Sequence, residues 1–121
     1  MENKMYKVDI VTRSEKLEEL KEELAKIGVT GMTVTNVYGC GLSGGHREVY
    51  RGHDVQINLV PKIKIEIVIY ETPVEDVIRT AEKVCRTGDI GDGKIFVFEV
   101  AQAVKIRTGE RDGAAIIDNK A

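Results

Sequence analysis

Apolar residues follow two different spacings along this chain, and the spacings predict the order of its helices and strands. In three segments they alternate with polar residues, which is the period of a strand that buries one face, and a fourth segment is a short apolar run typical of a buried strand. In two others they recur three or four positions apart, as on one side of a helix. We expect strands at residues 6–12, 32–38, 55–70 and 95–100, and helices at residues 14–27 and 73–85. This order is that of an α+β ferredoxin-like βαββαβ sandwich, an antiparallel sheet with two helices on one face.

Local signals predict where the helices begin and end. Ser14 can cap the first helix, and Gly28 can end it. Thr72 and Glu75 have the spacing of a capping box at the start of the second helix, with Pro73 at its first helical position.

The sheet face opposite the helices is predicted to be neither a second core nor a fully solvated surface. Its side chains are a mixture of apolar, hydroxyl and charged groups: Val11, Thr33, Lys62, Lys64 and Val68. A monomer has no second layer to cover the apolar members of this set. We therefore expect an oligomer that buries this face.

A long loop between the second and third strands, at about residues 39–54, is the largest break in the pattern. It holds five glycines and both histidines among few apolar residues. Loops longer than about 12–15 residues are usually functional or disordered in a compact domain. We expect this loop to become ordered on binding a partner. The chain end, about residues 109–121, is polar and is expected to be mobile.

The stretch with the clearest chemistry is the glycine-rich loop before the last strand. Gly88, Gly91 and Gly93 allow the backbone to turn its N–H groups toward an anion, and Lys94 adds a positive charge. The spacing nearly matches a P-loop, but Ile95 stands where that motif has the Ser or Thr that binds magnesium. The apolar run that follows predicts a buried strand, whereas a P-loop precedes a helix. The loop is either a polyphosphate site of a different architecture or an ordinary turn.

Composition restricts the remaining classes of function. The chain has 121 residues, which fits a single domain over residues 1–121. Its formal net charge of −2 gives no general attraction to nucleic acid or to acidic membranes. We expect neither a signal peptide nor direct membrane insertion. Cys40 and Cys85 fit no disulfide framework, which favours the reducing cytoplasm, and Cys85 falls on the buried side of the second helix.

Five separated segments resemble the PII nitrogen-regulatory signal-transduction proteins, in order and over nearly the whole chain. The segments are GVTGMTVT at residues 28–35, YRG at 50–52, LVPKIKIEI at 59–67, TGDIGDGKIFVF at 87–98 and IRTGE at 106–110. The resemblance implies a ferredoxin-like homotrimer that binds ATP or ADP in the clefts between neighbouring subunits. It also implies that the long loop, called the T-loop in that family, projects outward and engages target proteins.

Position by position, the resemblance implies the residues of the nucleotide site. The glycine-rich loop and the neighbouring strands would form it, with a basic pair from the adjoining subunit. The set from one subunit is Val11, Thr33, Gly39, Gly41, Lys62, Val68, Gly91, Asp92, Gly93 and Lys94, and the pair from the other is Lys105 and Arg107. Backbone N–H groups and cations of this kind offset the charge of a triphosphate.

Target recognition is expected on the T-loop, at His46, Tyr50 and Arg51. Tyr and Arg are enriched at binding hot spots. The targets of the family include ammonium transporters, nitrogen-assimilation regulators and metabolic enzymes. The implied function is the regulation of nitrogen or carbon metabolism by a protein that is not itself an enzyme.

The T-loop departs from the family where 2-oxoglutarate binds. In the family, an arginine and a glutamine follow the glycine that matches Gly41, and the glutamine helps to hold the Mg²⁺ that bridges ATP and 2-oxoglutarate. This chain has Leu42 and Ser43 there. Lys62 matches the family lysine at this site, and Arg13 could help to hold a carboxylate. We expect the protein to distinguish ATP from ADP and to bind 2-oxoglutarate weakly or not at all.

The covalent switches of the family are expected to be absent. Val55 replaces the tyrosine that is uridylylated in the proteobacterial branch, and His53 replaces the serine that is phosphorylated in the cyanobacterial branch. Regulation would then depend on ligands alone.

Two functions of other classes are alternatives to this one. A nucleotide hydrolase could use the glycine-rich loop with Asp92, but the sequence supplies no nucleophile, base and orienting group for it. An amino-acid-binding ACT-like domain has a similar fold but no need of a polyphosphate loop. Cys40, His46 and His53 match no zinc spacing and are interpreted as solvated loop residues.

Overall fold

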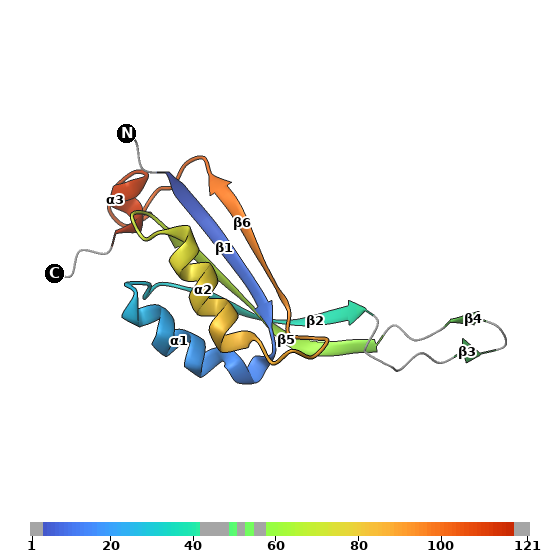
Figure 1. Cartoon of the computed structure of the whole chain (residues 1–121). Helices are drawn as coiled ribbons and strands as arrows, with labels where there is room; N and C mark the ends of the chain where they lie inside the picture. The colour runs from blue at the N-terminus through green and yellow to red at the C-terminus, as the bar shows by residue number, and fades with distance from the viewer. Residues whose placement is uncertain (1–3, 42–48, 51–52, 55–57, 118–121) are drawn as a thin grey trace.

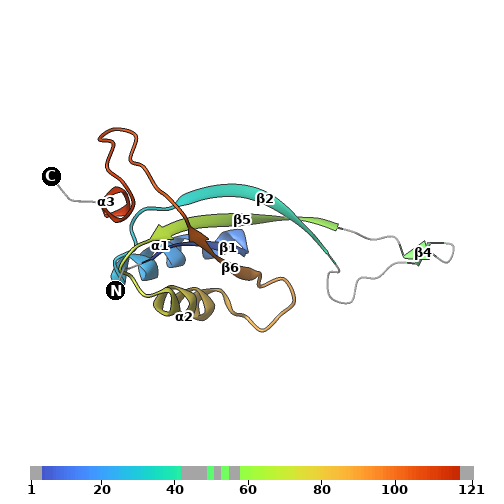
Figure 2. The ribbon, with the colours of Figure 1, turned by 90° about the horizontal axis from the view of Figure 1, so that it is seen from above.

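The computed structural model describes residues 4–41, 49–50, 53–54 and 58–117, and its elements follow the predicted order. A four-stranded antiparallel sheet carries two helices on one face (Figures 1 and 2). The strands of the sheet are β1 (Met5–Thr12), β2 (Thr33–Gly41), β5 (Asn58–Ile69) and β6 (Lys94–Val100), and the helices are α1 (Leu17–Lys26) and α2 (Val74–Cys85). The predicted ferredoxin-like fold is confirmed.

The sheet has the strand order β2-β5-β1-β6, so β5 and β1 lie in its centre. The register places Ile10 of β1 opposite Ile65 of β5 on one side and Ile95 of β6 on the other. Since side chains alternate between faces along each strand, even-numbered residues of β1 and odd-numbered residues of β5 face the helices. The strand periodicity in the sequence therefore reports the true faces of both central strands.

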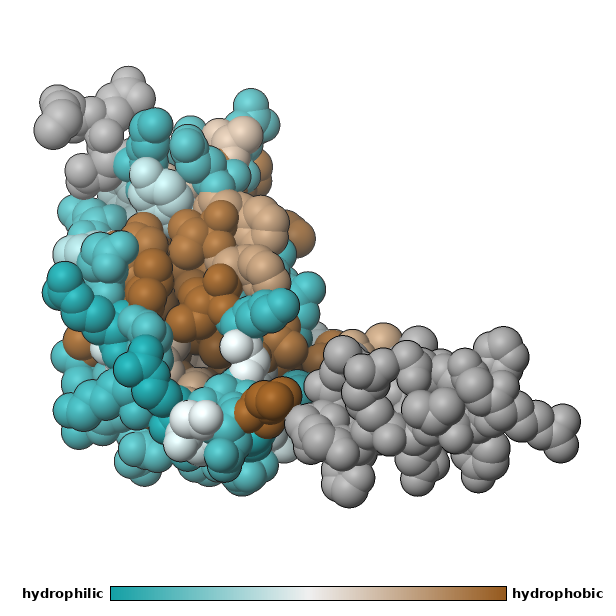
Figure 3. All heavy atoms as spheres, turned by 45° about the vertical axis from the view of Figure 1, so that its right-hand side comes forward, coloured by the Kyte–Doolittle hydropathy of each residue, from teal (hydrophilic) through white to brown (hydrophobic). Residues whose placement is uncertain are grey.

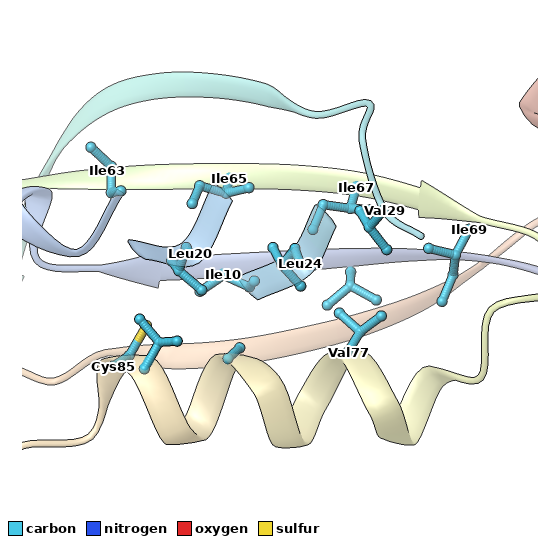
Figure 4. Packing of buried hydrophobic residues seen from close by; sticks show 13 residues of the cluster. Ile10, Leu20, Leu24, Val29, Ile63, Ile65, Ile67, Ile69, Val77 and Cys85 are labelled. Atoms are coloured by element: carbon cyan, nitrogen blue, oxygen red, sulfur yellow. The ribbon is translucent and has the colours of Figure 1, made fainter. Parts of the chain in front are cut away.

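The hydrophobic core lies between the sheet and the two helices (Figure 4). Its buried members are Val8, Ile10, Leu20, Leu24, Val29, Ile63, Ile65, Ile67, Ile69, Val77, Ala81, Val84 and Cys85. Burial raises the pKa of the Cys85 thiol, so this side chain remains protonated and acts as a small apolar group. The prediction that Cys85 is a core residue is confirmed.

The first helix begins later than predicted. Ser14 opens a short 3₁₀ turn, η1 (Ser14–Lys16), and the N-cap of α1 is Lys16, which makes no side-chain capping hydrogen bond. Ser14 as the N-cap is therefore wrong. The end of the helix is as expected, because Gly28 follows it with φ of +93°, a conformation that glycine adopts without strain.

The second helix also lacks the predicted capping box. Pro73 is its N-cap, with φ −63° and ψ 133°, so the proline precedes the first helical residue, Val74. Proline has no side-chain acceptor, and no side-chain capping hydrogen bond forms. Glu75 and Asp76 lie in the first turn instead, where negative charge favours the helix dipole.

The strand before the T-loop extends further than predicted, and the strand after it begins at Asn58 and not at residue 55. Beyond the end of β1, β2 and β5 continue to pair through Gly39 with Val60, Cys40 with Leu59 and Gly41 with Asn58. We call this two-stranded extension, residues 38–41 and 58–61, the stem; it projects past the helices (Figures 1 and 2). The predicted start of the loop at residue 39 is wrong because the backbone ladder continues to Gly41.

Within the loop, two short strands, β3 (Val49–Tyr50) and β4 (His53–Asp54), pair with each other. The T-loop positions outside the described residues are Leu42, Ser43, His46, Arg51 and Val55.

β6 is an edge strand and not the buried strand that was expected. Phe96 and Phe98 are 47% and 49% exposed. β6 pairs with β1 alone, and the register places both phenylalanines on the face without helices. Figure 3 shows apolar side chains gathered on the side of the molecule that carries β6. The prediction failed because an apolar run does not reveal whether the helical layer reaches it.

The uncovered face carries the five residues predicted for it and also a cluster of charges. Asp9 is only 5% exposed although no helix covers it. Its carboxylate lies 3.5 Å from Lys7 Nζ and 3.8 Å from Lys64 Nζ, and both lysines also lie 3.5 Å from Glu66. Asp9 Oδ1 has no hydrogen bond among the described residues, because its ion pair with Lys7 lacks hydrogen-bond geometry. The face thus combines exposed apolar surface with a buried carboxylate that is incompletely satisfied.

The chain after β6 is ordered further than predicted. Val104 and Arg111 form a β-bridge, and a short helix, α3 (Gly113–Ile116), follows. Gly113 packs on the ring of Tyr70, since a Cβ at this glycine would lie 2.5 Å from Tyr70 Cζ. Residues 109–117 of the predicted tail thus include a β-bridge and a short helix, and residues 118–121 lie outside the described part. None of the helices in the described ranges is long and apolar enough to span a membrane.

Candidate functional site

The glycine-rich loop connects α2 to β6 and turns beside the end of β1. Gly88, Gly91 and Gly93 have φ of +94°, +106° and +110°. Residues with a Cβ rarely adopt this region, so the backbone of the loop needs glycine at all three positions. The glycine pattern in the sequence thus has a direct conformational cause.

Gly93 fixes the point where the loop ends. A Cβ at this residue would lie 1.8 Å from the carbonyl oxygen of Val11. The next residue, Lys94, pairs with Val11 in the sheet. The close approach of the two backbones therefore sets the start of β6 and the distance between the loop and β1.

A cavity of about 860 Å³ lies between this loop and the stem. Six of the residues predicted for the nucleotide site line it: Val11, Gly39, Lys62, Gly91, Gly93 and Lys94. Its volume is within the range of small-molecule sites, about 300–1,000 Å³. Three cations, Arg13, Lys62 and Lys94, line the same cavity against one carboxylate, Glu15, so its net positive charge suits an anionic ligand.

Two of these cations donate hydrogen bonds to the backbone of the loop. Arg13 Nη2 donates to the carbonyl oxygen of Ile90 at 3.0 Å, and Lys62 Nζ donates to that of Gly91. The alkyl chain of Lys62 also runs beside Gly39, where a Cβ would lie 3.5 Å from Lys62 Cδ. Lys62 therefore connects the glycine-rich loop directly to the stem of the T-loop.

The other predicted nucleotide residues lie elsewhere. Thr33 and Val68 are on the uncovered face, and Val68 is six residues beyond Lys62 on β5, about 20 Å at ~3.3 Å per residue. Asp92 does not line this cavity. One chain thus brings together half of the predicted set.

Lys105 and Arg107 belong to the hairpin that follows β6, apart from the cavity. Lys105 Nζ lies 3.5 Å from Glu110, and Arg107 is exposed. The hydroxyl of Thr108, with Lys105 beside it, lowers the pKa of Glu110. The hairpin is therefore a formed, charged element that presents Arg107 outward, as a contribution to another subunit's cleft would require.

Sequence reasoning missed Thr12 and Thr87. Thr12 is 1% exposed, and its hydroxyl donates to the carbonyl oxygen of Asp92 at 2.7 Å. Its signal was a polar residue on the buried face of β1, at the last position of the strand. The hydroxyl of Thr87 donates to the carboxylate of Asp92 at 2.5 Å. For the described residues, no group of three or more His, Cys, Asp or Glu side chains is placed to hold a metal ion.

Known proteins share this fold over nearly its whole length. The family model for nitrogen regulatory protein P-II matches residues 5–110. The nitrogen regulatory PII-like protein of Bacillus subtilis (strain 168) is 50% identical over 116 residues, which are 96% of this chain and 100% of that protein.

Two solved structures show the same likeness. The B. subtilis GlnK–ATP complex has a TM-score of 0.79 and 46% identity, over 93% of this chain and 95% of that one. Arabidopsis thaliana PII bound to citrate has a TM-score of 0.77 and 36% identity, over 99% of this chain and 96% of that one.

This chain belongs to the nitrogen regulatory protein P-II family. The resemblance drawn from its five sequence segments is confirmed, and its function is that of a PII signal-transduction protein. PII proteins are trimeric regulators that act on target proteins.

The geometry of Gly93 gives the first testable prediction. Gly93→Ala should destabilise the fold strongly, because its Cβ would overlap the Val11 carbonyl in addition to straining φ. Gly88→Ala is the matched control, since it has a similar φ of +94° but no atom within 4 Å of the added Cβ. We expect urea denaturation to show a loss of about 1–2 kcal/mol for the control and clearly more for Gly93→Ala. Equal losses in the two variants would contradict the close approach.

Proposed function

We propose that this chain is a homotrimeric sensor of adenine nucleotides that regulates proteins of nitrogen or carbon metabolism through its T-loop. The observation that carries the proposal is the cavity between the glycine-rich loop and the stem. Its walls combine the backbone of Gly91 and Gly93 with the cations Arg13, Lys62 and Lys94. Because the cavity adjoins the stem, a nucleotide bound there can act directly on the base of the T-loop. The ATP complex of B. subtilis GlnK supports this choice of ligand.

The polyphosphate is the part of the nucleotide that this cavity suits. Glycines with positive φ leave the loop backbone open to close approach by an anion, and Lys94 is exposed at the cavity wall. ATP carries more negative charge than ADP, so three cations in one cavity favour the triphosphate and give the protein a means of distinguishing the two.

Two features support a homotrimer for this chain. The uncovered sheet face exposes Phe96 and Phe98 and holds the partly satisfied charge of Asp9, and a neighbouring subunit would cover both. Lys105 and Arg107 lie away from the cavity of their own chain, so they complete a nucleotide site only from an adjoining subunit.

A dicarboxylate is the proposed second ligand, but with weak affinity for 2-oxoglutarate. Lys62 and Arg13 provide positive charge at the base of the stem, and Arabidopsis PII bound to citrate is a relative in complex with a carboxylate. Leu42 and Ser43 replace the arginine and glutamine of the family pattern. Serine offers Mg²⁺ a hydroxyl oxygen on a shorter side chain than the glutamine amide, so the bridging metal is held less well.

The remaining details of the proposal come from the family. The expected targets are an ammonium transporter, a nitrogen-assimilation regulator or a metabolic enzyme, contacted through His46, Tyr50 and Arg51. We infer a cytoplasmic protein that is regulated by its ligands and has no enzymatic activity of its own.

The assembly can be tested directly. Because the uncovered face needs partners, the purified chain should have the mass of a trimer at micromolar concentration in multi-angle light scattering. A monomer under these conditions would contradict the proposed architecture.

The nucleotide site can be tested by charge removal. Lys94→Ala should weaken ATP binding by roughly ten- to a hundredfold in calorimetry, the equivalent of about 1.5–3 kcal/mol for a lost charge-assisted contact. Lys83→Ala is the matched control, because it removes the same charge from an exposed position on α2 that does not line the cavity. Equal ATP affinity in the Lys94→Ala and Lys83→Ala variants would mean that the loop is only a turn.

The second ligand can be tested by restoring the amide. Ser43→Gln should strengthen 2-oxoglutarate binding in the presence of Mg²⁺ and ATP, because the longer side chain can reach a bridging cation. Calorimetry without Mg²⁺ is the control, in which the substitution should have no effect. Tight 2-oxoglutarate binding by the natural protein would refute the interpretation of Ser43.

A further inference from the structure

The carboxylate of Asp92 lies inside the glycine-rich loop and is surrounded by donors of its own chain. Its Oδ2 accepts from the backbone N–H of Thr87 at 2.8 Å and from that of Gly88 at 2.9 Å. Its Oδ1 accepts from the hydroxyl of Thr87 at 2.5 Å and from Arg13 Nη1 at 2.7 Å. The backbone N–H of Gly88, which was predicted to face a bound anion, therefore donates to a carboxylate of the protein itself.

The same residue is held at its backbone. The carbonyl oxygen of Asp92 accepts from the buried hydroxyl of Thr12, and the neighbouring carbonyl of Ile90 accepts from Arg13. Two consecutive residues at the end of β1 thus fix both the side chain and the main chain of the loop. Gly91 and Gly93 flank this anchor and line the cavity, while Asp92 does not.

We propose that Asp92 is a positioning residue for nucleotide binding, whose carboxylate acts as an internal anion that closes the loop on itself and presents Gly91, Gly93 and Lys94 to the polyphosphate. This inference rests on the proposed nucleotide-sensing function. In this arrangement the carboxylate of Asp92 contacts only groups of the protein and not the ligand. It acts through the shape that it gives to the loop.

The electrostatics agree with this role. The hydroxyl and backbone of Thr87, the backbone of Gly88 and the charge of Arg13 lower the pKa of Asp92 from 3.8 to about 2. Because the pKa is lowered in the folded state, the carboxylate stabilises the fold fully above pH 3.8, and this contribution is lost as the pH falls through about 2. The anchor is therefore complete at neutral pH.

The contacts also separate this role from that of a general base in a hydrolase. A base needs a pKa near the working pH and an open hydrogen-bonding position for the proton that it accepts. The carboxylate of Asp92 has a lowered pKa and four donors of its own chain around it.

Asp92→Asn tests the proposal in the full chain, with Asp89→Asn as the matched control. Both variants remove one negative charge from the same loop, and the exposed Asp89 carboxylate makes no ion pair or hydrogen bond with other described residues. A purely coulombic role predicts equal or tighter ATP binding for both variants. The positioning role predicts that Asp92→Asn alone weakens ATP binding, by about tenfold or more, because an amide –NH₂ replaces one of the oxygens that accept from Thr87, Gly88 and Arg13.

Two further measurements make the test independent of misfolding. Thr87→Val removes one donor and leaves the charge of Asp92 in place, so it should weaken ATP binding, whereas Thr87→Ser keeps the hydroxyl and should restore it. Hydrogen exchange should show faster exchange of the Thr87 and Gly88 amides in Asp92→Asn than in Asp89→Asn.

The outcomes distinguish the two proposals. A wild-type chain that binds no adenine nucleotide would overturn the proposed function and this inference with it. Wild-type binding of ATP with the same affinity in Asp92→Asn, or equal weakening in Thr87→Val and Thr87→Ser, would overturn this inference alone.

Discussion

A strand that stops inside a sheet leaves the chain after it without ladder partners, and β1 stops in this way at Thr12, between β5 and β6. At this end of β1 the Thr12 hydroxyl and the Arg13 guanidinium donate hydrogen bonds to the glycine-rich loop. The same end point leaves β5 to continue with β2 alone as the stem. The cavity lies where it does because the loop and the stem both depart from the sheet at the end of β1.

Periodicity predicted the central elements because their two faces differ sharply in polarity. Ile63, Ile65, Ile67 and Ile69 alternate with charged or exposed neighbours, and all four are buried. It failed at β6, where apolar residues on both faces belong to an edge strand. The predicted helix starts were wrong for a related reason. The sequence shows which residues can cap a helix, but the path of the chain into the helix decides whether the capping hydrogen bond forms.

The site was predictable only where a residue's type is sufficient for its role. The glycines of the loop and Lys94 could be predicted from conformation and charge, whereas Lys62 was predicted only through the resemblance to the PII family. The contact between Arg13 and Asp92 joins residues 79 positions apart and depends on how β1 ends against the loop, which no local pattern encodes. Residues 39–41 of the stem were not predicted to be a strand because their glycines do not have the composition of one, although their backbones pair as one.

The continuous course of β5 has a mechanical consequence. Its 12 residues extend for about 40 Å, with residues 63–69 held in the sheet beside β1 and residues 58–61 in the stem. A stiff strand of this kind pivots near Ile63, where its pairing with β1 ends, and Lys62 is the next residue toward the stem. A tilt of about 5° at this point would move the outer end of the stem by roughly 1 Å over its ~13 Å length. A small displacement at the cavity would therefore be carried to the outer end of the stem.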